Sequence, residues 1–90
     1  MLTLDQIANI EEYSYYIQTL TPSQIIYSVP NGYGASIINH PYSYGIELAV
    51  LVMKNGYYQI TYETHITSDV VPFIQDMKEI KALLEEIHSL

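Results

Sequence analysis

The chain has no cysteine, no tryptophan and no arginine, and only three lysines among its 90 residues. Without cysteine, disulfides, thiolate zinc sites and thiol nucleophiles are excluded, and the composition fits a reducing compartment. No apolar run approaches the roughly 18 to 20 residues that a helix needs to cross a bilayer. The first residues also lack the basic and apolar regions of a signal peptide, so we expect a cytoplasmic protein.

The scarcity of cations limits the classes of partner. Ten acidic residues give the chain a formal net charge of -7. Affinity for nucleic acid and for anionic membrane surfaces depends on Lys and Arg, so the sequence predicts neither as a direct partner. A basic protein is the natural partner of such a chain, although negative charge also simply keeps a small protein soluble.

Length and hydropathy indicate one folded domain over residues 1–90. Hydrophobic residues make up 49% of the chain and charged residues 14%, which is too apolar for intrinsic disorder. A domain of this size builds only a modest core, and a partner subunit often adds stability to it.

The two ends of the chain have the spacing of helices. Near the N-terminus apolar residues recur every three to four positions, and Thr3 with Gln6 fits a capping box, so we expect a helix over residues 4–19. After it, residues 69–74 predict a short helical turn near a proline, and Asp76 caps a last amphipathic helix over residues 77–88.

Between these helices the pattern is that of strands. Residues 24–29 and 33–39 predict one hairpin, and residues 46–53 and 57–63 predict another around the turn Asn55-Gly56. The fold class is therefore α+β, with an antiparallel meander sheet of three to four strands. The two-residue turn predicts the pairs Lys54 with Tyr57, Met53 with Tyr58, Leu51 with Ile60, and Ala49 with Tyr62.

The run 46–53 is apolar on both sides, whereas 57–63 is polar on one, which predicts a central strand beside an edge strand. We expect the face of Leu51 and Ile60 to take the helices. The opposite face, that of Leu48 and Val50, then needs cover from another element or from a second copy in a homodimer.

Motifs for catalysis are missing from the sequence. His40, His65 and His88 have no metal-ligand spacing, and the glycines form neither a phosphate loop nor a dinucleotide fingerprint. No nucleophile elbow surrounds any serine. We expect no cofactor, no metal site and no enzymatic activity.

Tyrosine is the abundant aromatic residue, with ten in the chain. It combines an apolar face with a polar tip and is enriched at protein interfaces, although many tyrosines simply pack on a sheet. The loop Asn39–Gly45 joins two of them to a histidine and is the most site-like loop. We predict a partner-binding face from the tyrosines and carboxylates nearest to it: Tyr33, Asn39, His40, Tyr42, Tyr44, Glu47, Glu63 and Asp69.

A series of motifs resembles a family of small proteins encoded by phages and prophages of Gram-positive bacteria. The resemblance covers about residues 31–87, and the segment between Gly45 and Glu47 is shorter than the glycine-rich segment of that family. The matching stretches are Asn31–Ile38, Ser43–Gly45, Glu47–Leu51, Ile60–Thr64, Ile66-Thr67, Asp69-Val70 and Leu83–Ile87.

This resemblance implies a phage accessory protein in the cytoplasm of a bacterial host, and it implies no catalytic role. The first function that we expect is non-enzymatic binding to a host protein, for example inhibition of a defence system as by an anti-CRISPR. The alternatives are a small-ligand- or metal-binding protein and a structural or assembly protein of the virion.

Overall fold

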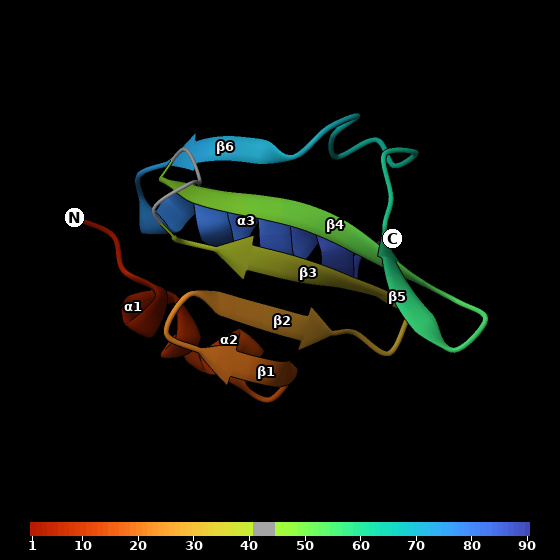
Figure 1. Cartoon of the computed structure of the whole chain (residues 1–90), viewed down its shortest axis with the longest axis horizontal. Helices are drawn as coiled ribbons and strands as arrows, with labels where there is room; N and C mark the ends of the chain where they lie inside the picture. The colour runs from red at the N-terminus through yellow and green to blue at the C-terminus, as the bar shows by residue number, and fades with distance from the viewer. Residues whose placement is uncertain (41–44) are drawn as a thin grey trace.

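The computed structural model describes residues 1–40 and 45–90. In this part of the chain, six strands form one antiparallel sheet with α3 behind it, so the predicted α+β class is confirmed (Figure 1). In chain order the elements are α1 (Leu4–Ala8), α2 (Glu11–Ser14), β1 (Ile17–Thr21), β2 (Gln24–Ser28), β3 (Tyr33–Ile38), β4 (Ile46–Lys54), β5 (Tyr57–Ile60), β6 (Val71–Ile74) and α3 (Met77–His88).

The sheet is a meander in the order β1-β2-β3-β4-β5, and β4 is its long central strand. The predicted pairs of Lys54 with Tyr57, Met53 with Tyr58, and Leu51 with Ile60 are confirmed. Asn55 has a φ of 54° and Gly56 a φ of 86°, which a tight Asn-Gly hairpin turn requires. Strand β5 ends at Ile60, so the predicted partners Ala49 and Tyr62 lie beyond the paired residues.

The predicted helical turn over residues 69–74 is wrong, because Val71–Ile74 forms β6. This strand pairs with the first half of β4, Ile46 with Ile74 and Leu48 with Val71, along the side that β5 occupies farther on. Val71 favours a strand, and a proline is tolerated where a strand has a free edge. Phe73 has a φ of 57°, and the register with β4 shifts in this stretch. The free edge of β4 therefore decided the structure of this segment.

A single helix over residues 4–19 is also wrong. After α1 the backbone of Ile10 is extended, with a ψ of 112°, and a separate short α2 follows. The chain then enters β1, which pairs with β2 across the turn at Pro22. The predicted capping box of Thr3 and Gln6 is confirmed. The spacing of apolar residues also identified side chains that point inward, since Leu4 and Ile7 both lie in the core.

The hydrophobic core lies between the helices and one face of the sheet. Leu48 and Val50 of β4 pack there with residues of α3, and Leu48 is 0% exposed. The helices therefore cover the face opposite to the predicted one, while Met53 and Ile60 remain 41% and 49% exposed. Because α3 of the same chain covers Leu48 and Val50, the argument for a homodimer through that face no longer holds.

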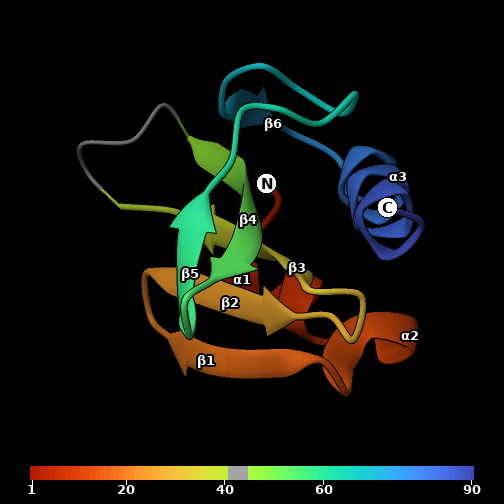
Figure 2. The same ribbon diagram turned by 90° about the vertical axis from the view of Figure 1, so that its right-hand side faces the viewer.

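Strand β5 lies on the side of the sheet away from α3, as the view in Figure 2 shows. The Tyr58 hydroxyl lies 2.6 Å from the Ser28 hydroxyl of β2, across the sheet. A Cβ at Gly34 would lie 3.3 Å from Tyr58 Cε1 and would collide with the Tyr27 carbonyl oxygen. The absence of a side chain at residue 34 permits this close approach.

Asn31 connects the β2–β3 turn to the end of α3. Its Nδ2 donates to the carbonyl oxygen of Ile87 at 2.8 Å, and its Oδ1 accepts from the backbone N–H of Tyr33 at 3.0 Å. Gly32 beside it has a φ of 89°, in the region that favours glycine. The Asn31 side chain thus links the β2–β3 turn to the C-terminal end of α3.

Candidate functional site

The predicted site residues fall into separate groups. Tyr33 begins β3, whereas Asn39 and His40 follow its other end. Glu47 joins Asn39 and His40, because the β3–β4 register places Glu47 opposite Ile38. Tyr42 and Tyr44 lie outside the described residues.

Glu63 and Asp69 belong to another part of the surface. Both are exposed and lie in the connection between β5 and β6. Glu63 follows β5, which pairs with Leu51–Lys54, the half of β4 away from the end of β3, and Asp69 precedes β6 on the far side of β4 from β3. Asp69 is held in a local turn, in which its carboxylate accepts from Val70 N–H at 2.7 Å. The structure therefore does not bring these two carboxylates to Asn39.

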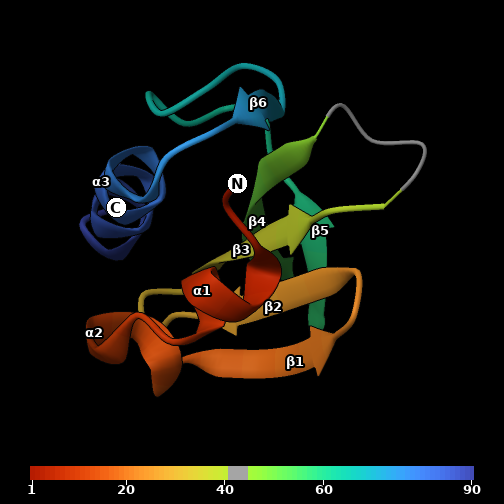
Figure 3. The same ribbon diagram turned by 90° about the vertical axis from the view of Figure 1, so that its left-hand side faces the viewer.

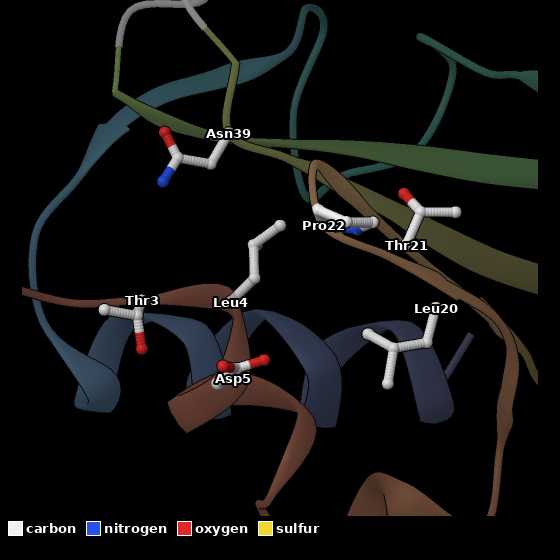
Figure 4. Close-up of a pocket in the computed structure, with 7 residues that line it drawn as sticks. All are labelled: Thr3, Leu4, Asp5, Leu20, Thr21, Pro22 and Asn39. Carbon is white, nitrogen blue, oxygen red and sulfur yellow. The ribbon is translucent and has the colours of Figure 1, made fainter.

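Asn39 borders two hollows. The larger, of about 510 Å³, is called the Asn39 hollow below and is shown in Figure 4. A second hollow, of about 390 Å³, lies between the N-terminal segment and the strands β4 and β6. The lining of the Asn39 hollow comes from α1, the β1–β2 turn and the end of β3, namely Thr3, Leu4, Asp5, Leu20, Thr21, Pro22 and Asn39.

Local hydrogen bonds fix the walls of the Asn39 hollow. Thr3 Oγ1 accepts from the backbone N–H of Gln6 at 3.1 Å and caps α1, which places Asp5 in the first turn. Across the hollow, the backbone N–H of Asn39 donates to the carbonyl oxygen of Ser23 at 2.9 Å. The turn between β1 and β2 is thereby anchored beside the end of β3.

The lining of the Asn39 hollow combines apolar surface with one carboxylate and one amide. Asp5 carries the only charge among the lining residues. Figure 4 shows the Asn39 amide and the Asp5 carboxylate on opposite sides of Leu4, with Leu20 at one flank. A long side chain with an apolar stem and a positive end, Lys or Arg, fits such a surface.

Six of these lining residues were absent from the predicted binding face: Thr3, Leu4, Asp5, Leu20, Thr21 and Pro22. The capping box did identify Thr3 and Gln6 as the start of a helix. No sequence signal placed Asp5 near residue 21, because the expected helix over 4–19 kept these residues apart.

A second group of titratable side chains joins α2 to α3. The His88 ring lies 4.6 Å from the Tyr16 ring and 5.0 Å from the Tyr13 ring, measured between centroids. Burial lowers the pKa of His88 below 6.5, and its Nε2 has no hydrogen-bond partner in the described part of the chain. Burial, with Glu85 and Glu12 beside it, raises the pKa of Tyr13. These rings act as packing between two helices.

Tyr27 is the largest side chain buried in the core. Burial raises its pKa to about 12, and its hydroxyl donates to the carbonyl oxygen of Ile7 at 3.4 Å. Tyr27 therefore stays neutral at physiological pH and contributes to the packing of the core.

Within residues 1–40 and 45–90, no cluster of three His, Asp or Glu side chains is arranged to hold a metal ion. The helices described for this chain are too short or too polar to cross a membrane. Comparison with protein-family models, with characterised proteins and with solved structures finds no match to this chain. The function is therefore inferred from the chain itself.

Proposed function

We propose that this chain acts by non-enzymatic binding to a basic host protein. The observation that carries the proposal is the Asn39 hollow, whose one charged lining residue is Asp5. The net charge of -7 supports the same class of partner, since opposite charges speed association and disfavour acidic competitors.

Binding is favoured over catalysis by the use of the hydroxyl groups in the hollow. Thr3 Oγ1 accepts from the N–H of Gln6, and Thr21 Oγ1 accepts from the N–H of Ser23 at 3.3 Å. Both hydroxyls therefore serve the backbone and are poorly placed to act as nucleophiles. What remains for a partner is a carboxylate, an amide and an apolar floor, which are groups of recognition.

The biological setting that we propose is a phage or prophage accessory protein in the bacterial cytoplasm, and it rests on the resemblance of residues 31–87. Within that setting, an acidic protein can occupy a surface that a host protein uses for nucleic acid. An inhibitor of a defence system, such as an anti-CRISPR, is the class that this mechanism favours.

The test is capture of host proteins on the immobilised chain at low and at high salt. We expect a basic protein that is retained at about 50 mM salt and released at about 500 mM, because exposed charges are screened at the higher concentration. The variant Asp5→Lys should lose the captured protein, and the control Glu86→Lys, which makes the same charge change on exposed α3 surface, should keep it.

Capture of an acidic protein, or equal capture by Asp5→Lys, would contradict the proposal. Loss of capture in Glu63→Lys alone would place the contact at the other end of the sheet. A thermal-shift screen of metals and nucleotides tests the alternative function, binding of a small ligand or metal. Tight binding of one compound would raise the melting temperature by mass action.

A further inference from the structure

Strand β1 is an open edge of the sheet, and it lies beside the Asn39 hollow. Within the described chain it pairs with β2 alone, and Figures 1 and 3 show no element beyond it. Its five residues, Ile17–Thr21, include no charge, no proline and no glycine. Natural sheets usually protect an edge with such residues or with a bulge. The register of β1 is irregular between Ile17 and Thr19 and regular from Thr19 to Thr21, so the second half of the strand is the template for another strand.

The register of the sheet determines which backbone groups of β1 point outward. On either side of β2, Ser23 O accepts from Asn39 N–H and Val29 N–H donates to Tyr33 O, so both residues bond toward β3. Backbone groups alternate along a strand, so the odd-numbered residues of β2 also bond toward β3. Ile25 belongs to this set, and it lies opposite Leu20 in the β1–β2 pair. In an antiparallel ladder, the N–H and C=O groups of two paired residues either both face each other or both face away from each other. Those of Ile25 face β3, so Ile25 and Leu20 form a pair without hydrogen bonds. The N–H and C=O of Leu20 therefore face away from the sheet.

We propose that β1 receives an added strand from the basic partner, with a Lys or Arg opposite Leu20 that extends into the Asn39 hollow. The inference rests on the proposed function and names the way in which the partner binds. Residues directly opposite each other on neighbouring strands present their side chains on the same face. Leu20 lines the hollow, so the residue opposite it reaches the same space.

The side chains on this face suit that arrangement. Leu20 is 54% exposed and, with Pro22, offers apolar surface for the stem of a long side chain. Asp5 then accepts the cationic end in a charge-assisted hydrogen bond. The neighbours of the Lys or Arg would lie on the other face beside Thr19 and Thr21, where small or β-branched residues fit best.

A second copy of the chain fits this edge less well. Strand β1 contains no lysine or arginine, so pairing of two β1 strands would bring no cation to Asp5. Each copy also carries a net charge of -7, which opposes self-association. Charge complementarity therefore selects a basic segment as the occupant of the edge.

The probe is a short capped peptide of alternating threonine and valine with one central arginine, and its control has citrulline in place of arginine. Amide NMR of the labelled chain with millimolar peptide should show shifts at Asp5, Asn39 and Leu20. The exchange of the Leu20 amide should also slow on binding. The citrulline peptide, which has the same shape without the charge, should bind about tenfold more weakly.

Two substitutions at one position separate backbone pairing from side-chain contact. Leu20→Pro removes the outward N–H and should weaken the arginine peptide about tenfold, whereas Leu20→Ala keeps the N–H and should weaken it less. Because the proline can disturb the hairpin, a peptide that is N-methylated at the arginine itself, whose N–H would face the Leu20 carbonyl oxygen in an antiparallel pair, provides the same test on the unmodified chain.

The outcomes distinguish the inference from the proposed function. Shifts at Asp5 and Asn39 without any response of the Leu20 amide would overturn strand addition and leave cation binding intact. Equal binding of the arginine and citrulline peptides would overturn cation recognition at the hollow. A chain that responds at neither place with millimolar peptide would overturn both.

Discussion

Among the four glycines, Gly34 is the one at which an added Cβ would meet neighbouring atoms. The Tyr27 carbonyl oxygen occupies the space that its Cβ would need, and Tyr58 Cε1 lies 3.3 Å from the same point. The Tyr58 hydroxyl meets the Ser28 hydroxyl at 2.6 Å. One glycine thus allows an aromatic ring of β5 to reach strand β2 over the face that the helices leave open.

Gly34→Ala should destabilise the chain by about 1–3 kcal/mol, because a Cβ forced into a packed site displaces backbone and ring. Urea unfolding at neutral pH measures the change. The control Ser36→Ala lies two residues farther along the same strand and loses only a side-chain bond with Gln24. Unfolding of Gly34→Ala at the same urea concentration as the unmodified chain would show that the close approach is absent in solution.

Strand β4 is the element on which the other layers depend. Its neighbours are β3 on one side and both β5 and β6 on the other. Both of its faces are apolar, so the sequence of the strand does not say which face the helices cover. The exposed fractions of side chains on the two faces show which one the helices cover, since Leu48 is 0% exposed and Met53 is 41% exposed.

Two truncations on β4 test that choice. Leu48→Ala should cost about 2–5 kcal/mol, because a buried side chain is removed under α3. Met53→Ala, from the opposite face, should cost less than about 1 kcal/mol, because the side chain is already partly in water. Chemical denaturation of the two variants compares them directly, and a larger loss for Met53→Ala would mean that the helices cover the other face.

Contacts between distant parts of the chain close the molecule at one end. The His88 ring packs on Tyr13 and Tyr16, and Asn31 bonds to the last turn of α3. These contacts join the N-terminal helices, the β2–β3 turn and the C-terminal helix. We therefore expect the stability of the chain to respond to the protonation state of His88, a partly buried histidine at this junction.

This dependence predicts an acid-sensitive fold. Burial lowers the pKa of His88, so below about pH 6.5 the unfolded chain binds a proton that the folded chain excludes. The free energy of unfolding should then fall as the pH drops from 6.5 toward the lowered pKa. His88→Phe keeps a ring between Tyr13 and Tyr16 and should reduce this slope, as measured by urea unfolding between about pH 7.5 and 5.5.

The exposed His65→Gln variant is the control for the loss of any histidine, and it should leave the slope unchanged. An identical slope in His88→Phe and in the unmodified chain would exclude His88 as the group that links folding to pH.

Local features of the sequence determined several elements correctly. The Asn55-Gly56 turn fixed the register of the β4–β5 hairpin, and Asp76 marked the start of α3, where its carboxylate accepts from Glu79 N–H at 2.9 Å. The apolar period of the N-terminal segment identified inward residues even though the helix is interrupted. Turns, caps and periodicity involve neighbouring residues, so one sequence is enough to show them.

The tertiary structure alone decided the strands β1 and β6, the face that α3 covers, and the Asn39 hollow. Residues 71–74 and 17–21 pair with sheet edges that only exist once the other strands are in place. Asp5 reaches the neighbourhood of Thr21 and Asn39 only because the chain turns back after α2. The sequence alone predicted an acidic protein that binds a partner through a tyrosine-rich loop. The contact proposed from the structure lies instead at the Asn39 hollow and the open edge of β1. Pairing between residues far apart in the chain is not encoded in local pattern, so the sequence could not show this place.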